Sequence, residues 1–260
     1  MKSDHIILAV FSVLLWTFFT LSCVFMFVLA FIVWMFTVFL DRRLRALHLF
    51  SSFWGSVYIW INPLWRVRIT GKEHIEKGRA CIMVSNHQSI LDILLLYGLF
   101  THFKFLSKSE NFRIPVIGWL MRLNRYPEII RGNPRSKQEL FTRVRDLLSE
   151  GSPVLVFPEG TRHPGGALGP FREGAFRMAL ENGVPIQPMV LEGTGRAVPR
   201  KGFILPGRTR IRLRVLEVIP NSVFTGQTPG EVAALVRSRM EGAYRELQDE
   251  VKRSTKKSGS

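Results

Sequence analysis

The amino-acid sequence predicts an α/β fold, with a mixed, largely parallel sheet flanked by helices and an N-terminal hydrophobic helical segment that anchors the chain in a membrane. Two observations lead to this fold class. Residues 6–40 contain no charge, no Gly and no Pro, and the run is well beyond the ~20 apolar residues that span a bilayer core. From about Trp65 onward, short β-branched or apolar runs alternate with longer segments of helical periodicity, which is typical of an α/β domain.

The N-terminal run is expected to be a membrane anchor. It continues until Asp41, Arg42 and Arg43, whereas the apolar region of a removable signal peptide is only ~7–15 residues long. A helix over the whole run would reach ~52 Å at 1.5 Å per residue, so it tilts steeply, extends past the bilayer or breaks near Ser22 and Cys23. The arginines that follow predict, by the positive-inside tendency, that the rest of the chain lies on the cytoplasmic side.

A second uncharged stretch follows at residues 49–65 and is rich in tryptophan and tyrosine. These residue types favour the headgroup region of a membrane, so we interpret the stretch as an interfacial helix or a short return into the membrane. The alternative is an aromatic-rich helix that packs on the soluble domain. The predicted boundaries are residues 1–64 for the anchor and interfacial helix, 65–251 for the α/β domain and 252–260 for a basic, disordered tail.

The soluble part alternates between predicted strands and helices. The strands are the runs at residues 65–70, 80–85, 103–107, 153–158, 185–190 and 210–218. The helices are at residues 89–100, 116–123, 136–149, 173–181 and 229–251. The last helix has apolar residues at spacings of three and four, a stripe that packs against the sheet.

The charge balance indicates an anionic partner. The formal net charge is +16, with 36 Lys and Arg against 20 Asp and Glu, which suits nucleic acid, acidic lipid or a phosphorylated substrate. Beside a membrane anchor, lipid is the simplest choice. The sequence has no zinc-finger spacing and no aromatic stacking platform, which argues against nucleic acid. It also has no cluster with metal-ligand spacing and no Walker-type loop, so we expect no metal and no phosphoester hydrolysis.

The stretch "VSNHQSILD" places a histidine in a strand-to-helix turn and an aspartate five residues later. Two residues five apart in a regular helix point ~140° away from each other. With His87 in the turn and Asp92 in the first helical turn, however, the carboxylate can reach back to the imidazole and make it a general base. The alternative is a capping box over Ser89 to Asp92, which satisfies free amides at the helix start. Both roles can coexist.

The stretch "GSPVLVFPEGTR" forms a strand followed by a tight turn. Gly160 lets the backbone approach a ligand, the following amides can point at an anion, and Arg162 offers a planar fork that matches phosphate oxygens. The alternative is a surface turn with an ion pair. Either motif by itself is weak evidence for a site.

Together, "NHQSILD" and, some 70 residues later, "FPEGTR" resemble the glycerolipid acyltransferase family, whose best-known members are the lysophosphatidic acid acyltransferases. The block "FLSKSENFRIPVIGWLMRLNRYPEIIRGNP" lies between them, and the block containing Val184 to Pro188 follows. The family often has Phe-Ile-Asp-Arg where this chain has Glu128 to Arg131, with no acid next to the arginine. The resemblance covers about residues 65–220.

The resemblance implies a membrane-bound enzyme that moves an acyl chain from a thioester donor to the free hydroxyl of lysophosphatidic acid. It implies that His87 takes the hydroxyl proton and that Asp92 holds His87 in position. Acyl-CoA or acyl-carrier protein is the co-substrate, and neither a metal nor another cofactor is implied. The residues assigned to the acceptor head group are Glu159, Gly160, Thr161, Arg162, Arg131 and, as a weaker candidate, Lys108.

Several alternatives stay open. The acceptor can be another lyso-lipid, such as a lyso-ornithine lipid or lysophosphatidylglycerol, because these share the base and donor chemistry. A non-enzymatic alternative is a membrane-tethered protein that binds anionic lipid. Arg208, Arg210, Arg212 and Arg214 alternate along one strand face, which is either a solvated face or a surface that rests on anionic lipid.

Overall fold

The structure is a computed structural model that describes residues 2–130, 132, 134–163, 165–198 and 203–256. Within these residues, the strands form two sheets. The main sheet contains β1 (Trp65–Thr70), β2 (Ile82–Ser85), β3 (Lys104–Phe105), β6 (Val154–Val156), β7 (Ile186–Glu192) and β8 (Thr209–Val215). A small second sheet contains β4 (Ser107–Lys108) and β5 (Glu128–Ile129).

The main sheet has the strand order β1-β8-β7-β2-β6-β3. All neighbouring strands are parallel except β7 and β8, which are antiparallel. The central strands β2, β6 and β7 are buried at every position, as expected for parallel strands covered on both faces. The predicted fold class, a mixed and largely parallel sheet flanked by helices, is therefore confirmed.

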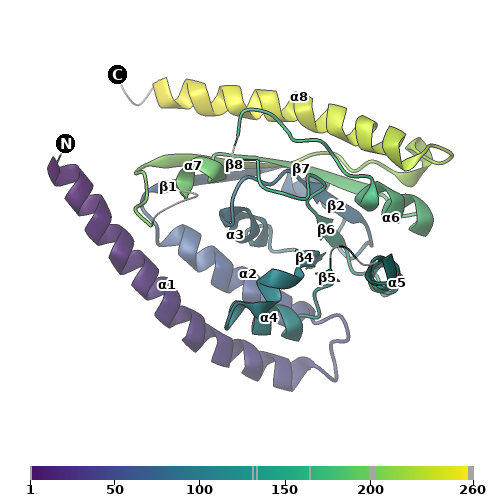
Figure 1. The fold of residues 1–260 in the computed structure, drawn as a ribbon, viewed down its shortest axis with the longest axis horizontal. Coiled ribbons are helices and arrows are strands. Elements are labelled where there is room, and N and C mark those ends of the chain that lie inside the picture. Colours follow the sequence, from purple (N-terminus) through teal and green to yellow (C-terminus); the bar gives the residue numbers. More distant parts are fainter. Residues whose placement is uncertain (1, 131, 133, 164, 199–202, 257–260) are drawn as a thin grey trace.

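Helices cover both faces of this sheet (Figure 1). Their bounds are α1 (Lys2–Thr37), α2 (Arg45–Trp60), α3 (Leu91–Tyr97), α4 (Ile117–Leu123), α5 (Pro134–Ser149), α6 (Gly174–Asn182), α7 (Thr194–Ala197) and α8 (Pro229–Lys256). Short 3-10 helices lie at η1 (Lys72–His74), η2 (Ser109–Arg113) and η3 (Asn221–Val223).

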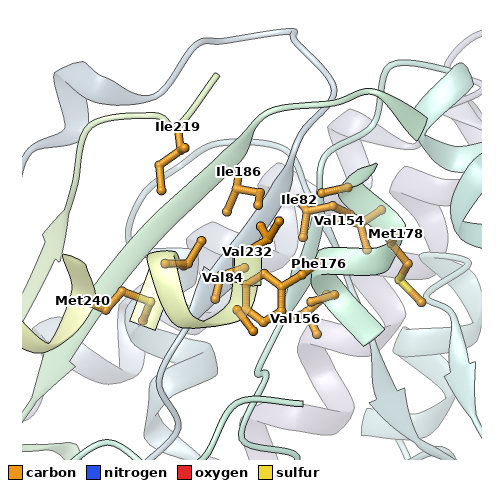
Figure 2. Packing of buried hydrophobic residues seen from close by; sticks show 14 of the residues in the cluster. Ile82, Val84, Val154, Val156, Phe176, Met178, Ile186, Ile219, Val232 and Met240 are labelled. Carbon is orange, nitrogen blue, oxygen red and sulfur yellow. The ribbon is translucent and has the colours of Figure 1, made fainter. Parts of the chain in front are cut away.

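Alternating side chains of the strands enter two separate cores. Ile82 and Val84 of β2 pack with Phe176 of α6 and with α5 and α8, and Figure 2 shows this cluster between strands and helices. Met83, between them in the sequence, points to the other face and packs with α2 and α3. Phe176 is fully buried, and truncating such a side chain to Ala costs about 3–5 kcal/mol.

The carboxyl ends of β2, β3, β6 and β7 meet at one edge of the sheet, because these strands are all parallel. In open α/β sheets, ligands bind outside this edge. The segments that leave the strands there are residues 86–90, 106–109, 157–173 and 193–197. Both sequence motifs lie on these segments.

The long helix α1 is continuous through Ser22 and Cys23, so the break near these residues, one of the three expected geometries, is absent. The segment His5–Thr37 is the part of the described chain that is long and apolar enough to cross a membrane. Its side chains also contact the rest of the molecule. The Trp16 Nε1–H donates to the Phe203 carbonyl (2.7 Å), and Ser22 Oγ lies 2.8 Å from the Tyr58 hydroxyl. The helix therefore lies against the domain, with α8 on the opposite side of the sheet (Figure 1).

The second apolar stretch forms α2, which begins and ends about four residues before the predicted bounds. Its aromatic residues Trp54 and Tyr58 are buried between α1 and the domain, while Trp60 is exposed. This burial agrees with the alternative of a packing helix. The helix ends before Asn62 because the residue preceding Pro63 is driven out of the α region, and the Asn62 side chain accepts the Leu64 N–H at 2.9 Å.

Two other elements differ from the sequence prediction. The predicted strand at 103–107 is divided, because the N–H of Leu106 still bonds to β6 whereas the N–H of Ser107 bonds to Pro127 and starts the second sheet. The tail predicted to be disordered is helical through Lys256, and residues 257–260 lie outside the described ones. Lys252 lies 3.7 Å from Asp249, and basic side chains at a helix C-terminus are favoured by its dipole.

Candidate active site

The histidine and aspartate predicted to meet are in contact. His87 lies in the turn between β2 and α3, and Asp92 is the second residue of α3. The His87 Nδ1 atom is 2.7 Å from Asp92 Oδ2. The Asp92 side chain is fully buried, whereas the His87 side chain is 17% exposed. The carboxylate therefore contacts one ring nitrogen from the buried side, while part of the ring is open to solvent.

Asp92 also caps its helix. Its Oδ2 atom accepts the backbone N–H groups of Gln88 (2.6 Å) and Ser89 (2.9 Å). These bonds fix the turn that carries His87, and a carboxylate is favoured in the first turn of a helix. The capping contacts of Asp92 and its contact with His87 thus share one oxygen. The other oxygen, Oδ1, is buried and accepts no hydrogen bond within the described residues.

An aromatic ring restrains the imidazole from a second direction. Phe157, at the end of β6, stacks on His87 with ring centroids 4.1 Å apart and an interplanar angle of 20°. With Asp92 at Nδ1 and Phe157 on one face, the ring is held in a single orientation. Nε2 is the ring nitrogen that Asp92 does not contact. Nothing in the sequence distinguished Phe157 from an ordinary strand residue.

The Glu159 carboxylate joins three segments of the site. Its Oε1 atom accepts the His87 backbone N–H (2.9 Å) and its Oε2 atom accepts the Gly169 N–H (2.9 Å). The side chain is almost fully buried. Burial raises the pKa of Glu159, while the two amides and the nearby His163 lower it by less. Both oxygens are therefore engaged by the protein, which holds the turn of His87 against the loop after β6.

His163 is a second histidine at the site that the sequence reasoning did not select. Its Nδ1 atom lies 2.6 Å from Glu159 Oε2, without the alignment of a hydrogen bond. Its backbone N–H donates to the His87 carbonyl at 2.7 Å, so the two motif turns bond directly to each other. The available signal was a titratable side chain immediately after "FPEGTR".

The turn after Glu159 places cationic residues at the same edge. Gly160 has φ +66°, and a Cβ added there would lie 2.7 Å from Nε of Arg172. Arg172 therefore packs directly on the glycine backbone, and its N–H donates to the Pro158 carbonyl (2.9 Å). The side chains of Thr161 and Arg162 are exposed. Arg172 stands in the fragment "GPFREG", where the sequence reasoning gave it no role.

The remaining predicted residues come from the segment after β3. Lys108 ends β4 and lies opposite Ile129 of β5. Arg131 lies outside the described residues. The structure thus brings together His87, Asp92, Glu159 and Gly160. Lys108 follows β3 at the same edge of the main sheet. The described part of the chain contains no group of three or more His, Cys, Asp or Glu side chains that could hold a metal ion.

Residues 66–192 match the family model described as Acyltransferase. The matched segment contains both motifs and the strands that position them. The chain therefore contains a domain of the acyltransferase family over these residues.

Two plant proteins are among the known relatives to which this chain is similar. The chain is 40% identical over 180 residues to the chloroplastic 1-acyl-sn-glycerol-3-phosphate acyltransferase BAT2 of Brassica napus, covering 68% of this chain and 52% of that protein. It is 38% identical over 195 residues to the chloroplastic 1-acyl-sn-glycerol-3-phosphate acyltransferase LPAT1 of Arabidopsis thaliana, covering 74% and 54%. The chain thus spans about half the length of these relatives.

A solved structure has the same fold over nearly the whole chain. The crystal structure of the 1-acyl-sn-glycerophosphate (LPA) acyltransferase PlsC from Thermotoga maritima superposes with a TM-score of 0.73, covering 95% of this chain and 97% of that one. The sequence identity is 23%. This likeness includes the N-terminal helices as well as the sheet.

Proposed function

We propose that this protein transfers an acyl chain from a thioester donor to the free hydroxyl of lysophosphatidic acid, with His87 as the general base. The observation that carries the proposal is the 2.7 Å contact between His87 Nδ1 and the buried Asp92 carboxylate, beside a turn that carries arginines. The names of the relatives support the choice of acceptor.

In the proposed reaction, the acceptor hydroxyl oxygen attacks the thioester carbonyl carbon while Nε2 of His87 takes the hydroxyl proton. The Asp92 carboxylate stabilises the imidazolium that forms and keeps Nδ1 protonated. The tetrahedral intermediate then collapses, the carbon–sulfur bond breaks, and the thiolate takes the proton from His87. The products are an ester and a free thiol, and the enzyme returns to its starting state without a covalent intermediate.

The acceptor phosphate is proposed to lie against the turn after β6. Arg162 is exposed there, and the guanidinium of Arg172 packs on Gly160. Guanidinium groups form paired, charge-assisted hydrogen bonds with phosphate oxygens. Arg131 and Lys108 are proposed as further phosphate contacts. Glu159 is proposed to hold the turn of His87 in position, because both of its oxygens already accept backbone N–H groups.

Helix α1 is proposed to bring this site to a membrane, where the acceptor lipid resides, with the catalytic domain on the cytoplasmic face. Its apolar side chains are largely exposed, and exposing so large an apolar surface to water is unfavourable. The arginines after the helix support the cytoplasmic orientation. Acyl-CoA and acyl-carrier protein are both compatible donors, because each presents a thioester.

The test is a substrate panel with the full chain in detergent. Lysophosphatidic acid, lysophosphatidylglycerol and a lyso-ornithine lipid are each supplied with acyl-CoA or acyl-carrier protein, and thiol release is followed together with the lipid product. We expect phosphatidic acid from lysophosphatidic acid, and a raised KM for this acceptor in Arg162→Ala. Turnover only with another lyso-lipid would be compatible with His87 as the general base, but would show that lysophosphatidic acid is not the acceptor. Thiol release without any acylated lipid would discard the transfer reaction.

A further inference from the structure

A groove separate from the candidate active site lies between α8 and the β1–β8 edge of the sheet. It has a volume of about 790 Å³ and is lined by Arg68, Arg212 and Arg214 from the strands and by Arg239 and Arg253 from α8. The groove is on the sheet face that α8 covers, whereas α1 lies on the opposite side (Figure 1). The arginine face of β8 therefore points away from the helix proposed to contact the membrane.

The strand register places like charges directly opposite each other. Arg68 of β1 pairs with Arg212 of β8, and Arg66 pairs with Arg210. All four side chains lie on the same face, because each is separated from the next by two residues along its strand. Like charges directly opposite in a sheet are destabilising. Burial lowers the pKa of Arg212, and Arg68 and Arg210 lower it further while Glu250 raises it.

The carboxylates of the groove neutralise only part of this charge. Five arginines line the groove against three glutamates. Arg214 is paired with Glu246 (2.8 Å) and with Glu250 of α8. The guanidinium of Arg212 donates to backbone carbonyls. Within the described residues, neither Arg68 nor Arg212 forms an ion pair with a carboxylate, so their repulsion is left for a ligand to offset.

Helix α8 separates this groove from His87. Arg239, Glu250 and Arg253 lie on one stripe of the helix, since eleven and fourteen residues return within about 40° of the same direction. Tyr244 lies about 140° away from Arg239 on the same helix, and its hydroxyl contacts Gln88, the neighbour of His87, at 2.8 Å. A ligand in the groove would therefore occupy a second site.

We propose that this groove is an anion-binding site in which Arg68 and Arg212 hold a phosphate group of a water-soluble phosphorylated molecule. The planar fork of each arginine matches phosphate oxygens, and a dianion between two guanidinium groups removes their repulsion. The position opposite α1 favours a soluble ligand over a lipid head group. The inference goes beyond the proposed acyl transfer and does not depend on it.

The test is a calorimetric titration of the full chain in detergent with inorganic pyrophosphate. We expect saturable binding in the wild type that Arg68→Gln and Arg212→Gln each weaken about tenfold or more, since each removes charge-assisted hydrogen bonds. Arg145→Gln, an exposed arginine of α5 (64% exposed), is the matched loss of charge outside the groove and should bind like the wild type.

The thermal melt gives an independent readout. Because Arg68→Gln removes a like-charge pair, the ligand-free variant should melt about 1–3 °C higher than the wild type at low salt. Absence of saturable pyrophosphate binding, or unchanged binding in both groove variants, would overturn the proposal. A titration with phosphatidic acid in detergent micelles distinguishes the source: if the groove variants weaken only this binding, the ligand is a lipid head group and the soluble-ligand proposal is wrong.

Discussion

The change Asp92→Asn separates the helix-capping contacts of this carboxylate from its proposed role as the partner of His87. In the wild type, Oδ2 accepts His87 Nδ1–H and the N–H groups of Gln88 and Ser89. The amide oxygen of Asn can keep these three bonds, because the other oxygen, Oδ1, has no partner among the described residues. The variant therefore keeps the turn and loses the negative charge that stabilises the imidazolium.

The expected effect is a large loss of turnover. Asp92 is fully buried, so solvent does not screen its interaction with the imidazolium. Removing one partner of a buried ion pair costs about 3–5 kcal/mol, and each 1.36 kcal/mol is a factor of ten in rate. We therefore expect kcat to fall about 10²- to 10⁴-fold, with KM for lysophosphatidic acid nearly unchanged, because Asp92 is buried behind His87.

The assay is the initial rate of phosphatidic acid formation, accompanied by a thermal melt. The matched control is Glu231→Gln, since Glu231 accepts the Thr228 N–H at the start of α8 and so caps a helix far from His87 along the chain. We expect the control to keep wild-type kcat. If Asp92→Asn keeps kcat within about threefold of the wild type, Asp92 is a helix cap alone and the orienting role is refuted.

Three further predictions concern single residues of the fold and site. Gly160→Ala should lose more stability and more affinity for the acceptor than Gly226→Ala. Both glycines have positive φ, but only Gly160 has Arg172 within 2.7 Å of the added Cβ. Thermal melts measure the stability and KM the affinity, and equal effects of the two changes would contradict the role of Arg172 packing. Burial raises the pKa of Glu159 in the folded protein. The stability that Glu159 contributes is therefore complete below the pKa of the unfolded chain, about 4.5, and is lost as the pH rises through the pKa of the folded protein. The difference in Tm between wild type and Glu159→Gln should therefore fall as the pH rises above about 4.5. A difference in Tm that stays constant with pH would refute this prediction. Burial lowers the pKa of Lys104 to about 7, so the unfolded chain binds more protons above this pH and the stability of the wild type rises from about pH 7 toward pH 10. Lys104→Met should abolish that rise in denaturant titrations, and a rise that persists would show that another group causes it.

The contact between His87 and Asp92 could be predicted because it is local. Five residues of sequence and the position of a strand end were enough to place the carboxylate beside the ring. The alternation of apolar runs likewise predicted each strand of the main sheet within a few residues. The order of the strands could not be predicted in this way, because it depends on pairings between residues about a hundred positions apart, such as β2 with β7.

The role of Glu159 could not be predicted, because its partners are backbone amides. One partner is 72 residues away in sequence and the other lies in a loop, and any residue could supply such an amide. For the same reason no role could be predicted for Phe157 and Arg172, because a stacked ring and a guanidinium on a glycine depend on how two turns meet. The division of the strand at 103–107 also follows from a long-range bond, from Ser107 to Pro127.

A comparison of the wild type with His87→Ala tests whether His87 is the general base. The full chain in detergent is given lysophosphatidic acid and an acyl thioester, and thiol release and phosphatidic acid are measured together. If His87 is the general base, the wild type should form equal amounts of both products. His87→Ala should lose at least about 10²-fold in kcat, the usual range for removal of a general base, and should melt close to the wild type. A folded His87→Ala that turns over within threefold of the wild type would show that His87 is not the general base.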